Sequence, residues 1–444
     1  MSPSVPGMTS AASPRIAASA PVRLAVAFVT AAVLAVLSLV SAPAAHANGM
    51  WPPHDPFYAA PADLASRAPG EVIRARSTRI KLGPGIQLPF KTYQVLYRTT
   101  DRTNTPIATV STIIVPTNNR PATDRKMLAY QTAYDGLSPA CRPSYSLQTG
   151  KVALQGAEVL LMLNILRRGW TIVTSDYEGP NDSWGVGPTT ARGVLDGIRA
   201  AESYAPAGFD KGVDTKVGMM GYSGGGNASA WANEYAPTYA PELNIVGAAY
   251  GGVGADLETI VKSLDGELYA GIAFAGIVGV TSAYPEVDMN KFLNNKGKKL
   301  FRDLKSPKMS CISDFFLSHP FEKFRSYTTH PDILHTPEFQ AIRAENALGR
   351  FVPKAKTLWY APYFDEMGSW WANQRVARDF CKAGTPMSFQ TSYIEEHAMQ
   401  AILKPWDAQK WIDDRFKGKP FKSNCPTSET GPFGPSPAFG KGFG

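Results

Sequence analysis

Short apolar runs alternate with amphipathic helical patterns over the first half of the chain. Stretches rich in Val, Ile, Thr and Tyr at 91–100 and 106–116, separated by a polar turn, predict a β-hairpin. Strands that alternate with helices form a mostly parallel sheet with helices on both faces, so the pattern predicts an α/β fold. The expected strands are 127–130, 170–174, 216–220 and 243–249, and the expected helices are 158–168, 192–204 and one that follows 223.

The alternation stops between residues 257 and 345, where the sequence is mixed and mostly helical. Strand character returns at 357–360 and at 387–393, with a helix at 370–384 between them. A helix-rich insertion between two strands is the simplest explanation. It would lie as a cap over the strand ends, where ligands bind in open α/β sheets. The domains expected are a core of 48–256 and 346–425, a cap of 257–345, and a Gly- and Pro-rich tail of 426–444.

The apolar stretch 268–284 allows two interpretations. It is rich in Ala, Gly, Ile and Val, so it could face lipid. The alternative, a buried cap helix whose small residues allow close packing, is favoured.

The first 47 residues are typical of a secretory signal peptide. Arg15 and Arg23 are the charged residues before an apolar run at 24–40, and Ala45-His46-Ala47 offers a cleavage site between small residues. A retained membrane anchor is the alternative, because the run is at the lower edge of spanning length. Export with cleavage is favoured, so we expect an extracellular protein that begins near Asn48 and keeps no stable membrane anchor.

The charge balance excludes one class of partner. The chain holds 45 Lys or Arg and 37 Asp or Glu residues, a net charge of +8, and the surplus is scattered apart from a small cluster at Lys296, Lys298 and Lys299. Nucleic-acid binding requires a concentrated basic face. We therefore expect no nucleic-acid partner and interpret the surplus as ordinary surface charge.

Four cysteines suit two disulfides in an exported protein. Cys141, Cys311, Cys381 and Cys425 match no zinc spacing, and no metal site is expected. Three connectivities are open. Cys141 with Cys311 and Cys381 with Cys425 is favoured, and the second pair would tie the C-terminal segment to the body.

The strongest chemical signal is Gly221-Tyr222-Ser223-Gly224-Gly225, which follows a predicted strand and precedes a predicted helix. In a nucleophile elbow the serine lies on a tight strand-to-helix turn, so its neighbours must be small. The glycine spacing fits neither a Rossmann motif nor a P-loop. The motif predicts Ser223 as a nucleophile in an α/β-hydrolase fold.

A serine hydroxyl needs a base within hydrogen-bond reach, and this base is oriented by an acid. In this superfamily the acid and then the histidine follow the serine along the chain. Among six histidines, His397 alone follows the last predicted strand region. Asp365, in the loop after 357–360, is the expected acid, with Glu366 as the alternative; Glu395 and Glu396 are expected to be solvated or to face the cap.

The oxyanion of such a reaction needs two donors. One is expected to be the backbone N–H of Gly224, and the other comes from the loop after an early strand. Here that loop is 131–136, it contains no HGGG motif, and Asp135 and Tyr134 are the candidates.

Several separated segments resemble the secretory lipases, exported α/β-hydrolases similar to Candida antarctica lipase A. The resemblance covers about residues 56–425 and is carried by the elbow and by segments 97–99, 130–135, 141–144, 175–179 and 233–243. It implies a triacylglycerol lipase or carboxylesterase with a helical cap and no cofactor. It also implies Ser223, Asp365 and His397 as triad, Asp135 with Gly224 as oxyanion pair, and the favoured disulfides.

Two segments depart from the family pattern. The acid loop reads Tyr363-Phe364-Asp365-Glu366-Met367, which leaves Asp365 and Glu366 both open, and Trp184 stands in an altered segment after the 175–179 match. The leading hypothesis is hydrolysis of lipid esters, and a lipid–water interface is a candidate place for this reaction. The alternatives are an esterase or acyltransferase for other acyl groups and a non-catalytic binding or envelope protein.

Overall fold

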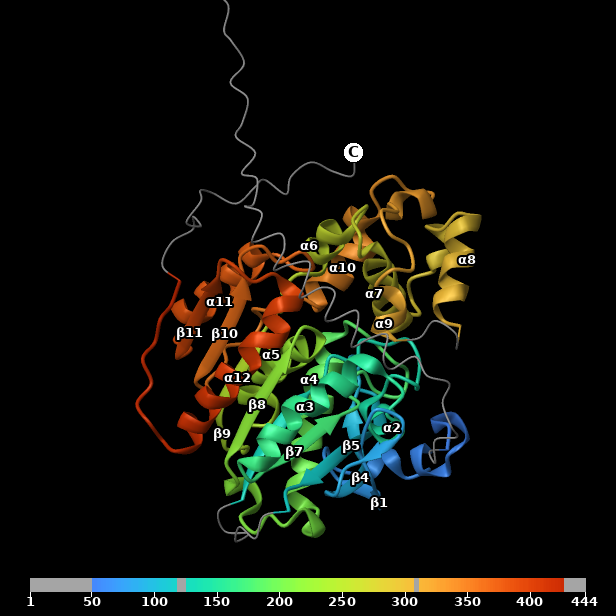
Figure 1. Ribbon diagram of the computed structural model, residues 1–444. Coiled ribbons are helices and arrows are strands. Elements are labelled where there is room, and N and C mark those ends of the chain that lie inside the picture. The colour runs from blue at the N-terminus through green and yellow to red at the C-terminus, as the bar shows by residue number, and fades with distance from the viewer. Residues whose placement is uncertain (1–49, 118–124, 307–310, 427–444) are drawn as a thin grey trace, which may run out of the picture. The chain divides into compact units, whose positions relative to one another are not determined.

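The computed structural model describes residues 50–117, 125–306 and 311–426 (Figure 1). All of them belong to one compact unit, residues 44–444. The predicted signal peptide and the tail from 427 onward lie outside the described residues. Within the described part of the chain, no helix is both long enough and apolar enough to cross a membrane.

A nine-stranded, mostly parallel sheet forms the centre of the protein. β4 and β5 form the predicted hairpin, and β1, β4, β5 and β7 pair antiparallel, whereas all pairs from β7 to β11 are parallel. A separate two-stranded sheet joins β2 (Lys81–Leu82) and β3 (Ile86–Gln87). In spatial order the large sheet contains β1 (Val72–Thr78), β4 (Lys91–Thr100), β5 (Pro106–Val115), β7 (Trp170–Ser175), β6 (Lys126–Gln131), β8 (Val217–Tyr222), β9 (Ile245–Gly251), β10 (Thr357–Pro362) and β11 (Met387–Ser392).

Helices cover both faces of this sheet. Neighbouring strand residues point to opposite faces, and in β8 Met219 packs in one hydrophobic cluster while Met220 packs in another. The Met219 cluster holds apolar residues of α4 (Gly187–Ser203), α5 (Gly224–Tyr239) and α11 (Trp370–Lys382). The Met220 cluster holds residues of α3 (Ala153–Arg167) and α12 (His397–Phe416). Burial on both faces explains why the strands are near-continuous apolar runs, and the predicted α/β-hydrolase fold is confirmed.

The chain between β9 and β10 is helical and has a core of its own. We call residues 257–345 the helical insertion; its helices are α6 (Leu257–Leu264), α7 (Ala270–Ser282), α8 (Asn295–Leu304), α9 (Ile312–Phe315) and α10 (Pro337–Glu345). α7 is buried for most of its length, as the favoured interpretation of 268–284 expected. A Cβ on Gly279 would lie 2.8 Å from the Cβ of Trp184, in the loop after β7, so a small residue is needed there.

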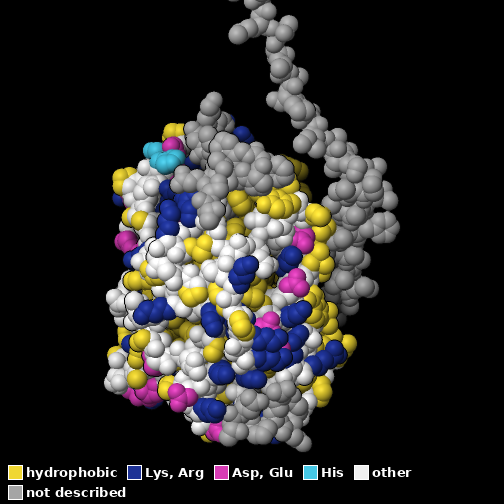
Figure 2. Space-filling view, turned by 90° about the vertical axis from the view of Figure 1, so that its left-hand side faces the viewer, with side chains coloured by type: hydrophobic (Ala, Val, Ile, Leu, Met, Phe, Trp, Pro, Cys, Tyr) yellow, Lys and Arg dark blue, Asp and Glu magenta, His cyan; other side chains and the backbone are white. Residues whose placement is uncertain are grey.

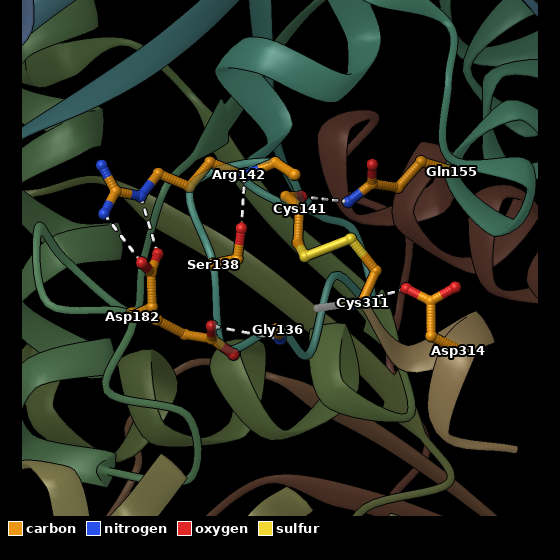
Figure 3. Close-up of a disulfide and its surroundings, with 10 residues drawn as sticks. Gly136, Ser138, Cys141, Arg142, Gln155, Asp182, Cys311 and Asp314 are labelled. Atoms are coloured by element: carbon orange, nitrogen blue, oxygen red, sulfur yellow. Dashed lines mark hydrogen bonds and ion pairs between the residues drawn. A yellow bond between two sulfur atoms is a disulfide. The ribbon is translucent and has the colours of Figure 1, made fainter. Parts of the chain in front are cut away.

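Two disulfides with the favoured connectivity are present. Cys141–Cys311 joins the loop after β6 to the residue that precedes α9, and Cys381–Cys425 joins α11 to the C-terminal segment. Next to Cys141, the Arg142 guanidinium donates to Asp182 over 2.7 and 2.9 Å (Figure 3). The first disulfide therefore ties the helical insertion to a loop at the carboxyl ends of the parallel strands, where α/β folds bind ligands.

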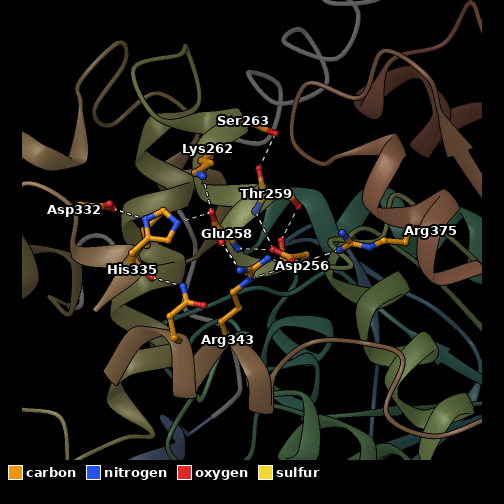
Figure 4. Close-up of polar contacts among 11 residues, drawn as sticks. Asp256, Glu258, Thr259, Lys262, Ser263, Asp332, His335, Arg343 and Arg375 are labelled. Carbon is orange, nitrogen blue, oxygen red and sulfur yellow. Dashed lines mark hydrogen bonds and ion pairs between the residues drawn. The ribbon is translucent and has the colours of Figure 1, made fainter. Parts of the chain in front are cut away.

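Charged side chains also hold the insertion to the core (Figure 4). The Asp256 carboxylate, at the start of α6, lies 2.8 Å from the Arg343 guanidinium of α10 and 3.7 Å from that of Arg375 on α11. Glu258 contacts Arg343 at 2.5 Å and the His335 ring at 3.2 Å.

On the face shown in Figure 2, Lys and Arg side chains gather in the lower half with Asp and Glu among them.

Candidate active site

Ser223 lies on the turn between β8 and α5, as the elbow motif predicted. Its backbone has φ 54° and ψ −123°, a conformation that a residue other than glycine adopts only when its surroundings impose it. Close backbone approach explains the neighbouring glycines: a Cβ on Gly221 would lie 2.1 Å from the carbonyl oxygen of Gly225. The turn presents the Ser223 hydroxyl at the carboxyl end of the sheet.

His397 is the first residue of α12, and its ring reaches Ser223. The distance from His397 Nε2 to Ser223 Oγ is 2.9 Å. The Tyr222 hydroxyl donates to the carbonyl oxygen of His397 over 2.8 Å, and the histidine is only 6% exposed. The imidazole is thus held beside the serine by contacts to its own backbone.

Asp365, and not Glu366, contacts the imidazole. Asp365 Oδ1 lies 3.0 Å from His397 Nδ1 and also accepts the backbone N–H groups of Met367 and Gly368. Burial by itself raises the pKa of Asp365, but the His397 charge and these hydrogen bonds outweigh it, so the pKa falls below the usual value. Glu366 Oε2 instead accepts the backbone N–H of His397 over 2.8 Å.

Three acids surround His397 and change its basicity. Burial lowers the pKa of the imidazole, but the charge and hydrogen bond of Asp365, followed by the charges of Glu366 and Glu396, raise it to about 9. Glu396 accepts the backbone N–H groups of Ala398 and Met399 and so caps α12. The sequence predicted that Glu396 is solvated or faces the helical cap, and its role as the N-cap residue of α12 was missed. An acid directly before a helix is a known signal for that role.

Asp135 lies against the elbow from the loop after β6. A Cβ on Gly224 would be 1.8 Å from Asp135 Oδ1, so the carboxyl group occupies the space beside that glycine. Burial raises the pKa of Asp135 to about 7, opposed by the His397 charge, the Trp184 indole N–H and the Gly224 backbone N–H. Oδ1 is buried and has no hydrogen-bond partner among the described residues.

Tyr134, the other candidate in this loop, points elsewhere. Its side chain is fully buried, and its hydroxyl oxygen accepts the backbone N–H of Glu178 over 2.7 Å. The tyrosine therefore fixes the loop to the segment after β7, and its hydroxyl does not face the elbow.

Two buried glutamates hold this loop and were not singled out from the sequence. Glu158, on α3, accepts the N–H of Ala133 over 3.3 Å, and Glu178 accepts that of Gly136 over 3.4 Å. Burial raises the pKa of Glu158 to about 8 and that of Glu178 well above its usual value. Glu178 lies in one of the family-like segments, whereas nothing local in the sequence marks Glu158.

The other histidines within the described residues lie apart from the serine. His335 joins the charged contacts of Figure 4, and His319 packs against Phe274 and Tyr327 in the helical insertion. Within the same described ranges, no group of three or more His, Cys, Asp or Glu side chains is arranged to hold a metal ion. The arrangement of Ser223, His397 and Asp365 can activate a hydroxyl for attack on a carbonyl carbon.

Comparison with known proteins finds lipases that are similar to this chain over most of its length. The chain is 33% identical to a probable inactive lipase of Mycobacterium tuberculosis over 386 residues, 84% of each chain. It is also 33% identical to lipase A of Arthroderma benhamiae, covering 85% of this chain and 82% of that one. The crystal structure of Candida antarctica lipase A in its closed state superposes with a TM-score of 0.79 at 29% identity, over 85% of this chain and 89% of that chain.

A family model settles the classification. The model of the secretory lipases matches residues 145–424, which include the serine, the acid and the histidine. The chain therefore belongs to the secretory lipase family.

Proposed function

We propose that this protein is an extracellular serine hydrolase that cleaves the carboxylic ester bonds of lipids, acting as a triacylglycerol lipase. The observation that carries the proposal is the continuous chain of contacts from Ser223 Oγ through the His397 ring to Asp365. The acid on the far ring nitrogen supports the proposal, because it holds the tautomer and stabilises the imidazolium that forms when the ring takes a proton. Family membership supports lipid esters as substrates, and secreted relatives support export.

His397 acts first as base and then as acid. Its Nε2 takes the proton of Ser223 Oγ as the oxygen attacks the ester carbonyl, and it then protonates the leaving alcohol. Asp365 accepts a hydrogen bond from the Nδ1–H group, which holds the ring in the required tautomer and stabilises the imidazolium. In the second half, the same nitrogen activates water against the acyl-enzyme and releases the fatty acid.

Gly224 and Asp135 form the oxyanion site of this proposal. The Gly224 N–H is the first of α5, so the helix dipole adds to its pull on a negative oxygen. The unpartnered Asp135 Oδ1 beside it supports the second role, because a buried carboxyl group kept neutral can donate a hydrogen bond. Its pKa of about 7 makes the neutral form accessible near neutral pH.

The substrate class is tested by chain-length profiling. We expect hydrolysis of emulsified long-chain triacylglycerols, measured by titration of the released fatty acid. We also expect a fluorophosphonate to label Ser223, measured by mass spectrometry. Hydrolysis restricted to short, soluble p-nitrophenyl esters would indicate an esterase, and transfer to an added alcohol in preference to water would indicate an acyltransferase. Because one relative is a probable inactive lipase, absence of a covalent adduct would favour a non-catalytic protein.

The space beside the elbow gives a second test. Gly224→Ala adds a methyl carbon that would lie 1.8 Å from Asp135 Oδ1, so either Asp135 or the turn must move. We expect kcat to fall by about 100-fold or more, the usual effect of losing an oxyanion donor, in a spectrophotometric ester assay. Gly156→Ala in α3 is the matched control, because its Cβ meets nothing within 4 Å. Full activity of the Gly224 variant would remove Asp135 from the oxyanion site.

A further inference from the structure

The segment that follows β7 resembles the secretory lipases at 175–179, yet none of its side chains belongs to the triad or to the oxyanion pair. We call residues 176–182 the β7 segment. We call residues 132–142, which join β6 to α2 (Pro143–Thr149) and carry Asp135, the oxyanion loop. Both begin at the carboxyl ends of β7 and β6, which pair in parallel, so they start side by side.

Asp135 has an unfavourable backbone conformation. Its φ is 32°, which residues other than glycine rarely adopt, and its side chain is only 4% exposed. Such strain persists only where the surrounding structure imposes it. On one side the elbow confines the loop, because a Cβ on Gly225 would lie 2.0 Å from the carbonyl oxygen of Gln131. The other contacts of the loop come from the β7 segment and from Glu158.

The β7 segment holds the residues just before Asp135. The Tyr177 hydroxyl donates to the carbonyl oxygen of Thr132 over 2.8 Å. The backbone N–H of Glu178 donates to the Tyr134 hydroxyl over 2.7 Å. The rings of Tyr134 and Tyr177 pack against each other with centroids 4.7 Å apart. Two hydroxyl groups and two rings therefore fix the backbone that leads into Asp135.

The same segment holds the loop after Asp135. The Gly136 N–H donates to Glu178 Oε2 over 3.4 Å. Near the end of the loop, the Arg142 guanidinium donates to Asp182 over 2.7 and 2.9 Å (Figure 3). Glu178 is 1% exposed, so water does not compete for its contact. The loop is thus joined to the β7 segment on both sides of Asp135.

The β7 segment is itself fixed to the body of the protein. The Asp176 N–H donates to the Val110 carbonyl oxygen of β5 over 2.8 Å, and the Thr109 hydroxyl donates to the Asp176 carbonyl oxygen over 2.8 Å. A Cβ on Gly193 of α4 would lie 3.3 Å from the Tyr177 carbonyl oxygen, so this helix packs closely on the segment. Anchored to a strand and a helix, the segment can impose a conformation on an irregular loop.

We propose that Tyr177 and Glu178 are positioning residues that hold Asp135 in its strained conformation and so aim its carboxyl group at the oxyanion of the substrate. The proposal rests on the proposed function, because it takes Asp135 as an oxyanion donor. Such donors stabilise the transition state only when they are already in place, and a displacement of about 1 Å can cost about 100-fold in rate. Loss of one contact should therefore lower kcat and leave KM unchanged.

Two tyrosines provide the first test. Tyr177→Phe and Tyr134→Phe each remove one hydroxyl contact between the two segments and keep the ring. We expect each to lower kcat about tenfold in hydrolysis of a p-nitrophenyl ester, with KM unchanged. Tyr284→Phe in the helical insertion is the matched control, because it also removes one buried hydroxyl contact, the one with Asn346. It should keep the wild-type kcat.

The Glu178 side chain allows a rescue. Burial raises its pKa well above the usual value, so the acid is neutral near pH 7. Glu178→Ala removes the acceptor of the Gly136 N–H and should lower kcat about tenfold. Glu178→Gln keeps an acceptor oxygen and adds no charge, so its kcat should stay within about threefold of wild type. An equal loss in both variants would overturn the assignment of Glu178.

A double-mutant cycle shows whether Tyr177 acts through Asp135. Asp135→Ala should itself lower kcat about 100-fold. Tyr177→Phe added to Asp135→Ala should then lower kcat by less than about twofold, because the group that it positions is already absent. A tenfold loss in both backgrounds would overturn the proposal, as would wild-type kcat in Tyr177→Phe.

Hydrogen exchange followed by mass spectrometry separates this proposal from the proposed function. Tyr177→Phe and Glu178→Ala should increase exchange in peptides that cover 132–136 and leave exchange in β8 and α5 as in wild type. Unchanged exchange at 132–136, or faster exchange throughout the protein, would contradict a positioning role. If the wild type hydrolyses no ester, a local increase would still support the positioning of Asp135, and only the proposed function would be rejected.

Discussion

Replacing Ser223 with alanine is expected to abolish ester hydrolysis, with kcat falling by about 10⁵-fold or more. The hydroxyl oxygen is the atom that attacks the ester in the proposed mechanism. Without it, only substrate binding and the oxyanion donors can accelerate the reaction. The measurement is hydrolysis of a p-nitrophenyl ester together with fluorophosphonate labelling. Both signals should disappear.

Ser229, on the helix α5 that follows the Ser223 turn, provides the control. The Ser229 hydroxyl is buried and has no hydrogen-bond partner within the described residues, so Ser229→Ala should leave activity and circular dichroism unchanged. The Ser223 variant should also keep the wild-type circular dichroism, because within the described residues the Ser223 side chain hydrogen-bonds only to His397 and none of the bonds within the turn is lost. Turnover by Ser223→Ala above about a hundredth of wild type would reject Ser223 as nucleophile.

The adjacent acids Asp365 and Glu366 should give very different results. Asp365→Asn is expected to lower kcat by about 10³- to 10⁴-fold, because the amide no longer stabilises the imidazolium or selects its tautomer. Glu366→Gln should lower kcat less than tenfold, since the amide oxygen can still accept the His397 backbone N–H. A loss with Glu366→Gln as large as with Asp365→Asn would make Glu366 the catalytic acid.

The pH profile adds an independent measurement. His397 must be neutral to accept a proton, so kcat/KM of wild type should rise with pH up to about 9, the raised pKa of the imidazole. The Asp135 carboxyl keeps its proton further into this range, because the neutral imidazole no longer lowers the pKa of Asp135. The negative charge of Glu366 contributes to that increase. Removing it in Glu366→Gln lowers the pKa of His397, and the rising limb should move to lower pH. A limb that stays in place or moves to higher pH would contradict this assignment of charges.

The pattern of apolar residues predicted the position of the helical insertion in the chain, but it did not predict how the insertion packs. Its interruption of the strand–helix alternation was visible in the sequence, and the structure places α6–α10 between β9 and β10 as expected. Its role as a cap stays a prediction. The packing of α8 beside residues 322–327, where Lys296 contacts Glu322 and the Tyr327 ring, could not be predicted from the sequence.

The sequence by itself determined the features that depend on neighbouring residues. The turn at Ser223 needs glycines next to the serine because the backbone there leaves no space for a Cβ, and strand and helix periods show in consecutive residues. His397 was predicted as the base because few histidines compete and the order along the chain is restrictive, and its ring lies 2.9 Å from Ser223 Oγ.

Only the tertiary structure decided the features that depend on direction and burial. Asp365 and Glu366 are adjacent, and the path of the loop after β10 relative to α12 selects which one meets the ring and which one meets the backbone. Asp135 and Glu158 are separated by 22 intervening residues, yet both become buried near the elbow, where desolvation raises their pKa values to about 7 and about 8. Burial is a property of the packed chain, so these carboxyl groups could not be distinguished from surface acids before the fold was known.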